Sequence, residues 1–289
     1  MSTHVEKDDV TGRATTGHEW DGIKELNTPL PKWWLYSFYA TIVFSAAYMV
    51  AYPAIPWLDG HTEGTLGYTA RGAVVEDLAA ARAGQGALRE RIAAASLEEI
   101  RRDPDLFAFA VTGGKVAFAE NCAGCHQAGG AGATGYPTLA DDDWLWGGSL
   151  DQVHATIQHG IRNADAESRQ SMMPRFGTDG ILTPKQIGAV ADYVLSLSGA
   201  AARPGAGAEG AALFAENCAA CHGEKAQGNA EMGAPNLADA VWLYGGDRAS
   251  VVKSITAARA GSMPAWNERL DPVTVKMLTE YVHSLGGGK

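Results

Sequence analysis

Two short segments of this 289-residue chain combine two cysteines and a histidine in the same spacing. The first holds Cys122, Cys125 and His126, and the second holds Cys218, Cys221 and His222. Positions i, i+3 and i+4 of a helix share one face, so two thiols one turn apart can bond to the two vinyl groups of one haem while the histidine reaches its iron. Because no cysteine is left over, the spacing predicts two covalently bound haem c groups.

Other chemistries also use a pair of cysteines separated by two residues. A zinc site made by four cysteines and a thioredoxin-like redox pair are the alternatives. Neither explains why a histidine directly follows both pairs, so the haem interpretation is preferred.

A haem iron that carries electrons commonly takes a methionine thioether as its sixth ligand. Met173-Pro174 and Met263-Pro264 lie at matching places after the two motifs. Met172 is a rival, but Met173 is preferred because it aligns with Met263. We expect each methionine to serve the haem of its own repeat, since a shorter loop closes at a smaller entropy cost. A crossed arrangement remains open, because that cost rises by only about 0.6 kcal/mol per doubling of loop length.

The surroundings of the two haems are also indicated by position. The backbone carbonyls of Pro137 and Pro235 are placed to accept the Nδ1–H of the histidines, which fixes the imidazole tautomer. Trp144 and Trp242 are candidates to pack on a haem edge or to donate to a propionate, and plain core packing is the alternative.

A further group of polar residues has a less specific interpretation. Arg162 and Arg175 are candidate partners of haem propionates. Three histidines have no counterpart in the other repeat and are expected to be structural or exposed: His154, His159 and His283.

The two motifs belong to a longer internal repeat. FAENCAGCH (118–126) returns as FAENCAACH (214–222), PTLADDDWLWGG (137–148) returns as PNLADAVWLYGG (235–246), and ADYVLSLSG (191–199) returns as TEYVHSLGG (279–287). Blocks repeated in one order predict two copies of one domain. We assign them to residues 105–200 and 210–289, joined by an Ala/Gly/Pro-rich linker at 201–209.

Residues 33–58 contain no charged side chain. A helix of about 20 residues spans the ~30 Å core of a bilayer, and aromatic residues cluster at both ends, as in interfacial belts. We predict a transmembrane segment at 32–58 with a regular helix at 32–52, after a tail at 1–31. A signal peptide or a buried core helix is the alternative, but 32 mostly polar residues precede the segment.

The orientation of this segment follows from its flanking basic residues. Arg13, Lys24 and Lys32 precede it, whereas the first basic residue after it is Arg71. The positive-inside rule therefore places the N-terminus in the cytoplasm and the haem domains outside, which in a bacterium is the periplasmic side of the inner membrane.

Residues 59–104 are predicted to form a helical connector. Residues 74–82 and 87–95 have helical composition and are expected to be interrupted by Gly84 and Gly86. A capping-box pattern at Ser96 and Glu99 begins another helix, expected to stop at Pro104. The predicted fold class is thus mainly α: one transmembrane helix followed by two class I-type cytochrome c domains.

The charge balance excludes one class of partner. The net charge is −10, from 23 basic and 33 acidic residues, and the sequence pI is about 5.2. An acidic surface opposes binding to nucleic acid and favours electrostatic steering of a basic protein partner.

These motifs together resemble a known family. The pattern CxxCH…PxL…W…MP…Y-L, occurring twice after a helix that begins ELNTPLPKWW (25–34) and ends YPAIPW (52–57), is similar to the membrane-anchored dihaem subunit III of cbb3-type cytochrome c oxidases. The resemblance covers residues 20–285. It implies an electron-transfer subunit that takes electrons from a donor cytochrome c and passes them, through a monohaem cytochrome c subunit, to a catalytic haem-copper subunit that reduces oxygen and pumps protons.

Two other functions remain as alternatives. A membrane-anchored dihaem cytochrome could act as a free electron shuttle. A dihaem peroxidase needs an iron with a ligand that it can vacate, which two methionine-capped irons disfavour. No nucleophile–base pair is evident in the sequence, so we expect no active site in this chain.

Overall fold

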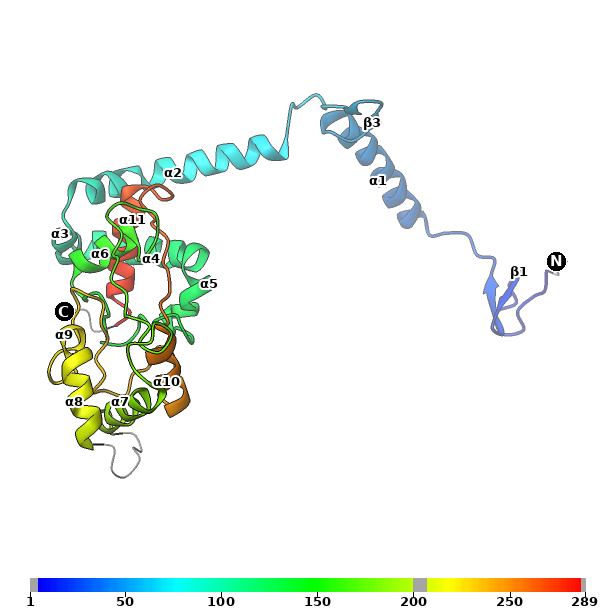
Figure 1. Ribbon diagram of the computed structural model, residues 1–289. Coiled ribbons are helices and arrows are strands. Elements are labelled where there is room, and N and C mark those ends of the chain that lie inside the picture. The colour runs from blue at the N-terminus through cyan, green and yellow to red at the C-terminus, as the bar shows by residue number, and fades with distance from the viewer. Residues whose placement is uncertain (1–4, 200–206, 287–289) are drawn as a thin grey trace. The chain divides into compact units, whose positions relative to one another are not determined.

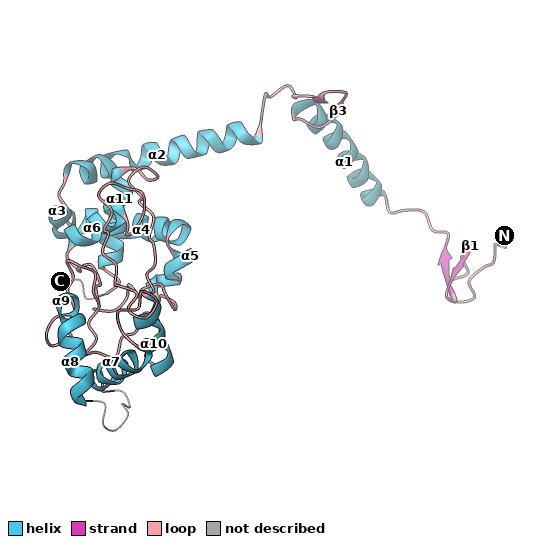
Figure 2. Ribbon diagram, in the orientation of Figure 1, coloured by secondary structure: helices cyan, strands magenta, loops and turns pink. Residues whose placement is uncertain are grey.

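The computed structural model describes residues 5–199 and 207–286. It divides into two compact units, residues 1–84 and 85–289. Figure 2 shows helices joined by loops over most of the chain, with the paired strands near the N-terminus. The predicted mainly α fold class is therefore confirmed.

A small β-hairpin precedes the first helix. Strands β1 (Thr15–Trp20) and β2 (Ile23–Leu26) are antiparallel. The turn residues Asp21 and Gly22 have φ of +47° and +85°, the conformation that favours Asp-Gly in two-residue hairpins. The sequence analysis treated residues 1–31 as a tail and missed this hairpin, although the Asp-Gly pair was its signal.

Helix α1 (Lys32–Ala51) is the one candidate membrane span among the described residues. Its 20 residues are long enough to cross a bilayer, and none of its side chains is buried within the protein. The helix ends one residue before the predicted position. The rest of the predicted segment leaves the helix and forms β3 (Pro56–Trp57), which pairs with β4 (Gly60–His61).

The connector is more regular than predicted. Helix α2 (Ala70–Ala94) runs without interruption through Gly84 and Gly86, so the expected breaks are wrong. Glycine costs a helix about 1 kcal/mol relative to alanine, which weakens it without ending it. Ser96 and Glu99 form the predicted capping box at the start of α3 (Leu97–Arg102).

The haem-binding motifs lie in a set of helices that the two repeats share. The first repeat forms α4 (Pro104–Asn121), α5 (Ala123–His126), the 3₁₀ turn η1 (Ala128–Gly130), α6 (Leu150–His159) and α7 (Pro184–Leu197). The second forms α8 (Gly207–Asn217), α9 (Ala219–His222), α10 (Arg248–Ala257) and α11 (Pro272–His283). Pro104 begins α4 instead of only ending the preceding helix, as proline at the first helical position permits.

The two repeats exchange their last helices. Helix α4 of the first repeat packs against α11 of the second, while α7 of the first repeat packs against α8 of the second. Figure 1 shows both pairs, with α11 in red at the C-terminal end of the colour scale. The packing units therefore do not coincide with the sequence repeats at 105–200 and 210–289. Most of the linker predicted at 201–209 lies outside the described residues.

Both helix pairs depend on a glycine at the contact. A Cβ at Gly114 of α4 would lie 2.1 Å from the carbonyl oxygen of Met277 on α11. A Cβ at Gly210 of α8 would lie 2.3 Å from the carbonyl oxygen of Ala189 on α7. Only a residue without a side chain permits such an approach of two backbones.

Equivalent aromatic side chains cover each contact. Phe118 packs on Tyr281 with ring centroids 5.3 Å apart, and Tyr193 packs on Phe214 at 5.5 Å. Each aromatic pair joins one residue from each repeat and lies in a hydrophobic core built from both repeats. Cys122 packs against one of these cores, and Cys218 belongs to the other. We call them the Cys122 lobe and the Cys218 lobe.

Helix α11 also contacts the C-terminal end of the connector helix α2. Lys276 donates to the carbonyl oxygens of Ile92, Ala93 and Ala95 at 3.1, 3.0 and 2.6 Å. These carbonyls belong to the C-terminal end of α2, where backbone acceptors lack partners within the helix. The ammonium group of Lys276 therefore caps the connector helix.

We expect Gly114→Ala to destabilise the helical unit by about 3 kcal/mol, because the new methyl group overlaps the backbone of α11. Gly86→Ala is the matched control: nothing lies within 4 Å of its Cβ position, so it should leave stability unchanged or slightly increased. Guanidinium unfolding of both variants, followed by circular dichroism, measures the difference. Equal midpoints would contradict the close contact.

The carboxyl group of Glu280 provides a second prediction. It is fully buried, with Arg101 at 3.8 Å, and burial raises its pKa from 4.5 to about 7. The folded state then binds a proton more tightly than the unfolded state, so stability falls as pH rises from about 4.5 to about 7. The loss is about 3 kcal/mol. Glu280→Gln should remove this slope, whereas Glu98→Gln on α3, which removes only the smallest of the causes that shift this pKa, should largely retain it in unfolding curves measured across that range.

Candidate haem sites

Both motifs adopt the same short helix directly after a longer one. Cys122 ends α4 and Cys218 ends α8, and the following residues form α5 and α9. The backbone N–H of His126 donates to the carbonyl of Cys122 at 2.9 Å, and that of His222 donates to Cys218 at 3.0 Å. One helical turn thus brings both thiols and the imidazole of each motif to one face.

A backbone carbonyl fixes each imidazole. Nδ1 of His126 lies 3.0 Å from the carbonyl oxygen of Pro137, and Nδ1 of His222 lies 2.9 Å from that of Pro235. With Nδ1–H as donor, Nε2 keeps its lone pair available for a metal. Burial lowers the pKa of both histidines, so the neutral form that can bind iron is favoured.

The cysteines are unpaired and do not converge on one point. All four are free thiols, and burial raises the pKa of Cys122 and Cys218 to about 11. Within residues 5–199 and 207–286, no group of three or more His, Cys, Asp or Glu side chains could hold one metal ion. The arrangement therefore gives no support to a four-cysteine zinc site.

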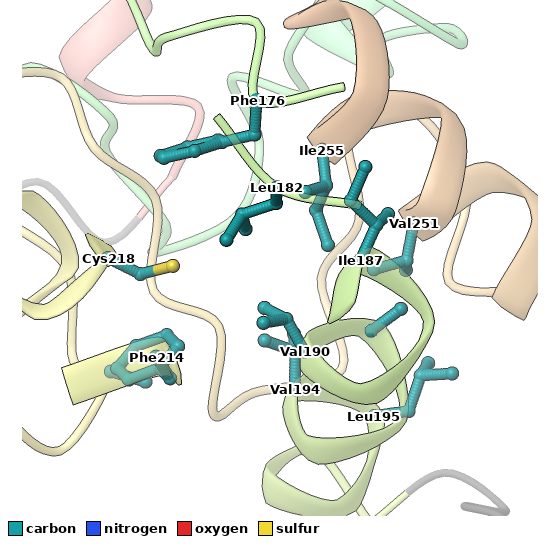
Figure 3. Close-up of a cluster of buried hydrophobic side chains, with 12 residues drawn as sticks. Phe176, Leu182, Ile187, Val190, Val194, Leu195, Phe214, Cys218, Val251 and Ile255 are labelled. Atoms are coloured by element: carbon teal, nitrogen blue, oxygen red, sulfur yellow. The ribbon is translucent and has the colours of Figure 1, made fainter. Parts of the chain in front are cut away.

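Met173 lies beside the second motif. A cavity of about 220 Å³ is lined by Met173 together with Cys218, Cys221 and His222. Figure 3 shows Cys218 facing this space opposite Val190, Val194 and Phe176 of the first repeat. This placement favours the crossed arrangement over the expected local one, because α7 and the loop before it belong to the Cys218 lobe.

Met172, the rival of Met173, lines the same cavity. Its side chain is 67% exposed, whereas Met173 is partly buried against the core of the Cys218 lobe. This burial favours Met173, and the choice between the two stays a prediction.

Met263 lies in the Cys122 lobe. It exchanges two backbone hydrogen bonds with Ile161, of 2.9 and 3.0 Å. Trp266, three residues later, packs against the core that contains Cys122, and its N–H donates to the carbonyl of Ile157. The Met263 segment thus adjoins α6 of the first repeat and the core against which Cys122 packs.

Trp144 shows that the Cys122 lobe suits a haem. Its indole Nε1 is buried without a hydrogen-bond partner in the described chain, and its ring packs against the core beside Cys122. A buried N–H without an acceptor is unfavourable, and an acidic group such as a haem propionate would satisfy it. Trp242 lines the cavity of the Cys218 lobe.

The two candidate arginines differ. Arg175 is exposed and pairs with Asp179 at 2.8 Å. Arg162 is partly buried and donates to the backbone carbonyls of Ser171 and Gly261. None of these contacts was predicted. The bonds of Arg162 join a side chain to distant backbone, for which the sequence offers no pattern.

The three unmatched histidines lie outside the motifs. His159 contacts Asp165 at 3.0 Å, and His283 is buried beside Arg101. His154 is partly buried on α6. These positions agree with structural roles.

Comparison with family profiles divides the chain into three segments. Residues 12–59 match the N-terminal domain of cytochrome oxidase-cbb3, FixP. Residues 111–198 match cytochrome c, and residues 205–282 match cytochrome c oxidase, cbb3-type, subunit III. The first segment contains the hairpin and α1, and the other two contain one motif each.

Curated proteins match the chain over its full length. The cbb3-type cytochrome c oxidase subunit FixP of Bradyrhizobium sp. (strain ORS 278) is 53% identical over 100% of both chains. FixP of Azorhizobium caulinodans is 54% identical over 100% of this chain and 98% of its own. The subunit CcoP of Cereibacter sphaeroides is 49% identical over 95% of both.

Haem content tests the two attachment sites separately. Removing both thiols of one motif, by Cys122→Ser with Cys125→Ser or by Cys218→Ser with Cys221→Ser, should leave one covalent haem per chain, because each pair attaches its own haem. Intact mass and haem staining of denatured protein give the count. Two haems, or none, in both double variants would contradict independent attachment.

Proposed function

The chain belongs to the family of FixP and CcoP subunits of cbb3-type cytochrome c oxidases, and we propose that it conducts electrons through two crossed haem sites without an active site of its own. Two cytochrome c domains in such a subunit imply two covalent haem c groups. Each group, when bound, supplies an iron that accepts and releases one electron. The observation that supports the crossed sites is the cavity that Met173 lines together with Cys218, Cys221 and His222.

The side chains of each site have separate tasks. His126 and His222 offer Nε2 to the irons, while the carbonyls of Pro137 and Pro235 orient the rings and raise their basicity. Burial of the surrounding side chains excludes water, which favours the less charged reduced state of an iron site. Neither lobe needs to move a proton or bind a small substrate for this task.

The sixth ligands follow from the crossed packing. Met173 lines a cavity with His222, and the Met263 segment bonds to Ile161 just after α6, whose residues belong to the core beside Cys122. We assign Met173 to the iron held by His222 and Met263 to the iron held by His126. A thioether ligand raises the reduction potential relative to a second imidazole.

The proposed orientation in the membrane determines which proteins the haem lobes can meet. The basic residues before α1 favour an N-terminus in the cytoplasm and haem lobes in the periplasm of a bacterial inner membrane. There the lobes take electrons from a donor cytochrome c and pass them, through a monohaem subunit, to the catalytic haem-copper subunit. Full-length similarity to oxidase subunits disfavours a free shuttle, and the acidic chain suits a basic donor and no nucleic acid.

Spectral labelling distinguishes crossed from local methionine ligation. Cys125→Ala leaves one vinyl group of the first haem unsaturated, which moves its visible absorption band to longer wavelength and identifies it. In that background Met263→His should lower the potential of the labelled haem by on the order of 0.1 V, within the ~0.8 V range that axial ligands span. Met173→His should lower that of the other haem. Spectropotentiometric titration measures both, and the reverse assignment would restore local pairing.

Turnover of the assembled oxidase tests the conducting role. In the complex that carries Cys218→Ser with Cys221→Ser, oxygen consumption with a donor cytochrome c should fall at least tenfold, because one of the two irons is missing. A small reductant that reaches the catalytic subunit directly should support an unchanged rate, which serves as the control for assembly. Unaffected turnover with the cytochrome would argue against conduction through this subunit.

A further inference from the structure

One guanidinium contacts both methionine loops. Nε of Arg162 donates to the carbonyl oxygen of Gly261 at 2.7 Å, and Nη1 donates to that of Ser171 at 2.8 Å. Gly261 lies two residues before Met263, and Ser171 lies two residues before Met173. The side chain therefore bonds at the same offset before each proposed sixth ligand.

The backbone of this arginine is itself fixed. Its N–H donates to the carbonyl of Arg169 at 2.8 Å, and its carbonyl accepts from Oγ of Ser262 at 2.9 Å. Its φ of +49° lies in the left-handed region, which costs a residue with a side chain energy and persists where the surroundings hold it. The guanidinium thus starts from a rigid base between the two loops.

The neighbouring residue adds to the same contact. Asn163 donates from Nδ2 to the carbonyl of Met263 at 2.7 Å and to that of His159 at 2.8 Å. The loop that follows α6 therefore holds the Met263 segment by both a side chain and the backbone, whereas Arg162 extends the link to the Met173 segment.

The environment strengthens these bonds. Arg162 is partly buried and lines the cavity beside His222, and its desolvation lowers its pKa. A guanidinium stays protonated in proteins, and a charged donor makes a stronger hydrogen bond than a neutral one, more so away from water. Its planar geometry also fixes the direction of two donors at once.

Other arginines near the sites have different partners. Arg175, two residues after Met173, is exposed and pairs with Asp179. Arg259 donates to Ser250 and Ser254 within its own helix region. Within the part of the chain that the structure describes, neither donates a hydrogen bond to the carbonyls of Ser171 and Gly261.

We propose that Arg162 is a positioning residue shared by the two haem sites, whose single guanidinium holds both methionine loops against their irons. The proposal rests on the crossed ligand assignment made above. Loss of the guanidinium frees both loops together, although no part of Arg162 needs to touch iron. A residue that merely supported one lobe would affect one site.

The test measures methionine–iron coordination in the full-length protein with both haems attached. Ferric Arg162→Met should bind imidazole at two irons with at least tenfold higher affinity than the unmodified protein, because the thioethers are displaced more easily. The long-wavelength charge-transfer band of thioether-bound ferric haem should weaken by the same proportion at both sites. Arg175→Met is the matched control and should bind imidazole as the unmodified protein does.

Each outcome has a separate meaning. A change at one iron, or at neither, in Arg162→Met overturns the shared role. Absence of the thioether band in the unmodified protein would instead reject the ligand assignment on which the proposal rests. Arg162→Lys keeps the positive charge but lacks the planar pair of donors, so it should also raise imidazole affinity at both irons. Full retention of methionine coordination in this variant would mean that the charge alone matters, and it would overturn the positioning role. This variant also decides the question if Arg162→Met does not fold.

Discussion

The approach of two backbones at Gly114 and Gly210 is the constraint on which the rest of the helical unit depends. Each glycine brings a first helix against a last helix from the other repeat. Once those pairs are made, the loop that carries Met173 lies beside the motif of the second repeat. The crossed sites that we propose therefore depend on a helix contact outside the two motifs.

Loop lengths explain why the sequence favoured packing within each repeat, whereas the helices pack across the repeats. Pairing within repeats would close loops of residues 122–183 and 218–271, that is 62 and 54 residues. Exchange closes residues 198–206 and 122–271, that is 9 and 150 residues. Treated as independent loops, the exchanged pairs are favoured by about 0.8 kcal/mol. The number of residues between a motif and a methionine is therefore the wrong measure of loop closure. The ends of the packed helices set which loops close first.

What could be predicted from the sequence has a physical pattern. Features set by neighbouring residues were found: the start of α1 at Lys32, the Ser96 capping box and the contact of His126 with Pro137. Features set by distant backbone were missed. The exchange and the bonds of Arg162 depend on which surfaces fit, and two nearly identical repeats offer almost the same residues to either partner.

The exchange of helices also sets the order in which the two lobes are completed during synthesis. Synthesis delivers α7 to α10 consecutively, so the Cys218 lobe has all its helices once Ala257 is complete. The Cys122 lobe, whose cysteines are made first, lacks α11 until His283 is complete. The earlier motif must therefore await the end of the chain before its pocket closes, which leaves its thiols accessible to the attachment machinery longest. A polypeptide that stops before α11 would lack a helix of the Cys122 lobe and would still contain every helix of the Cys218 lobe.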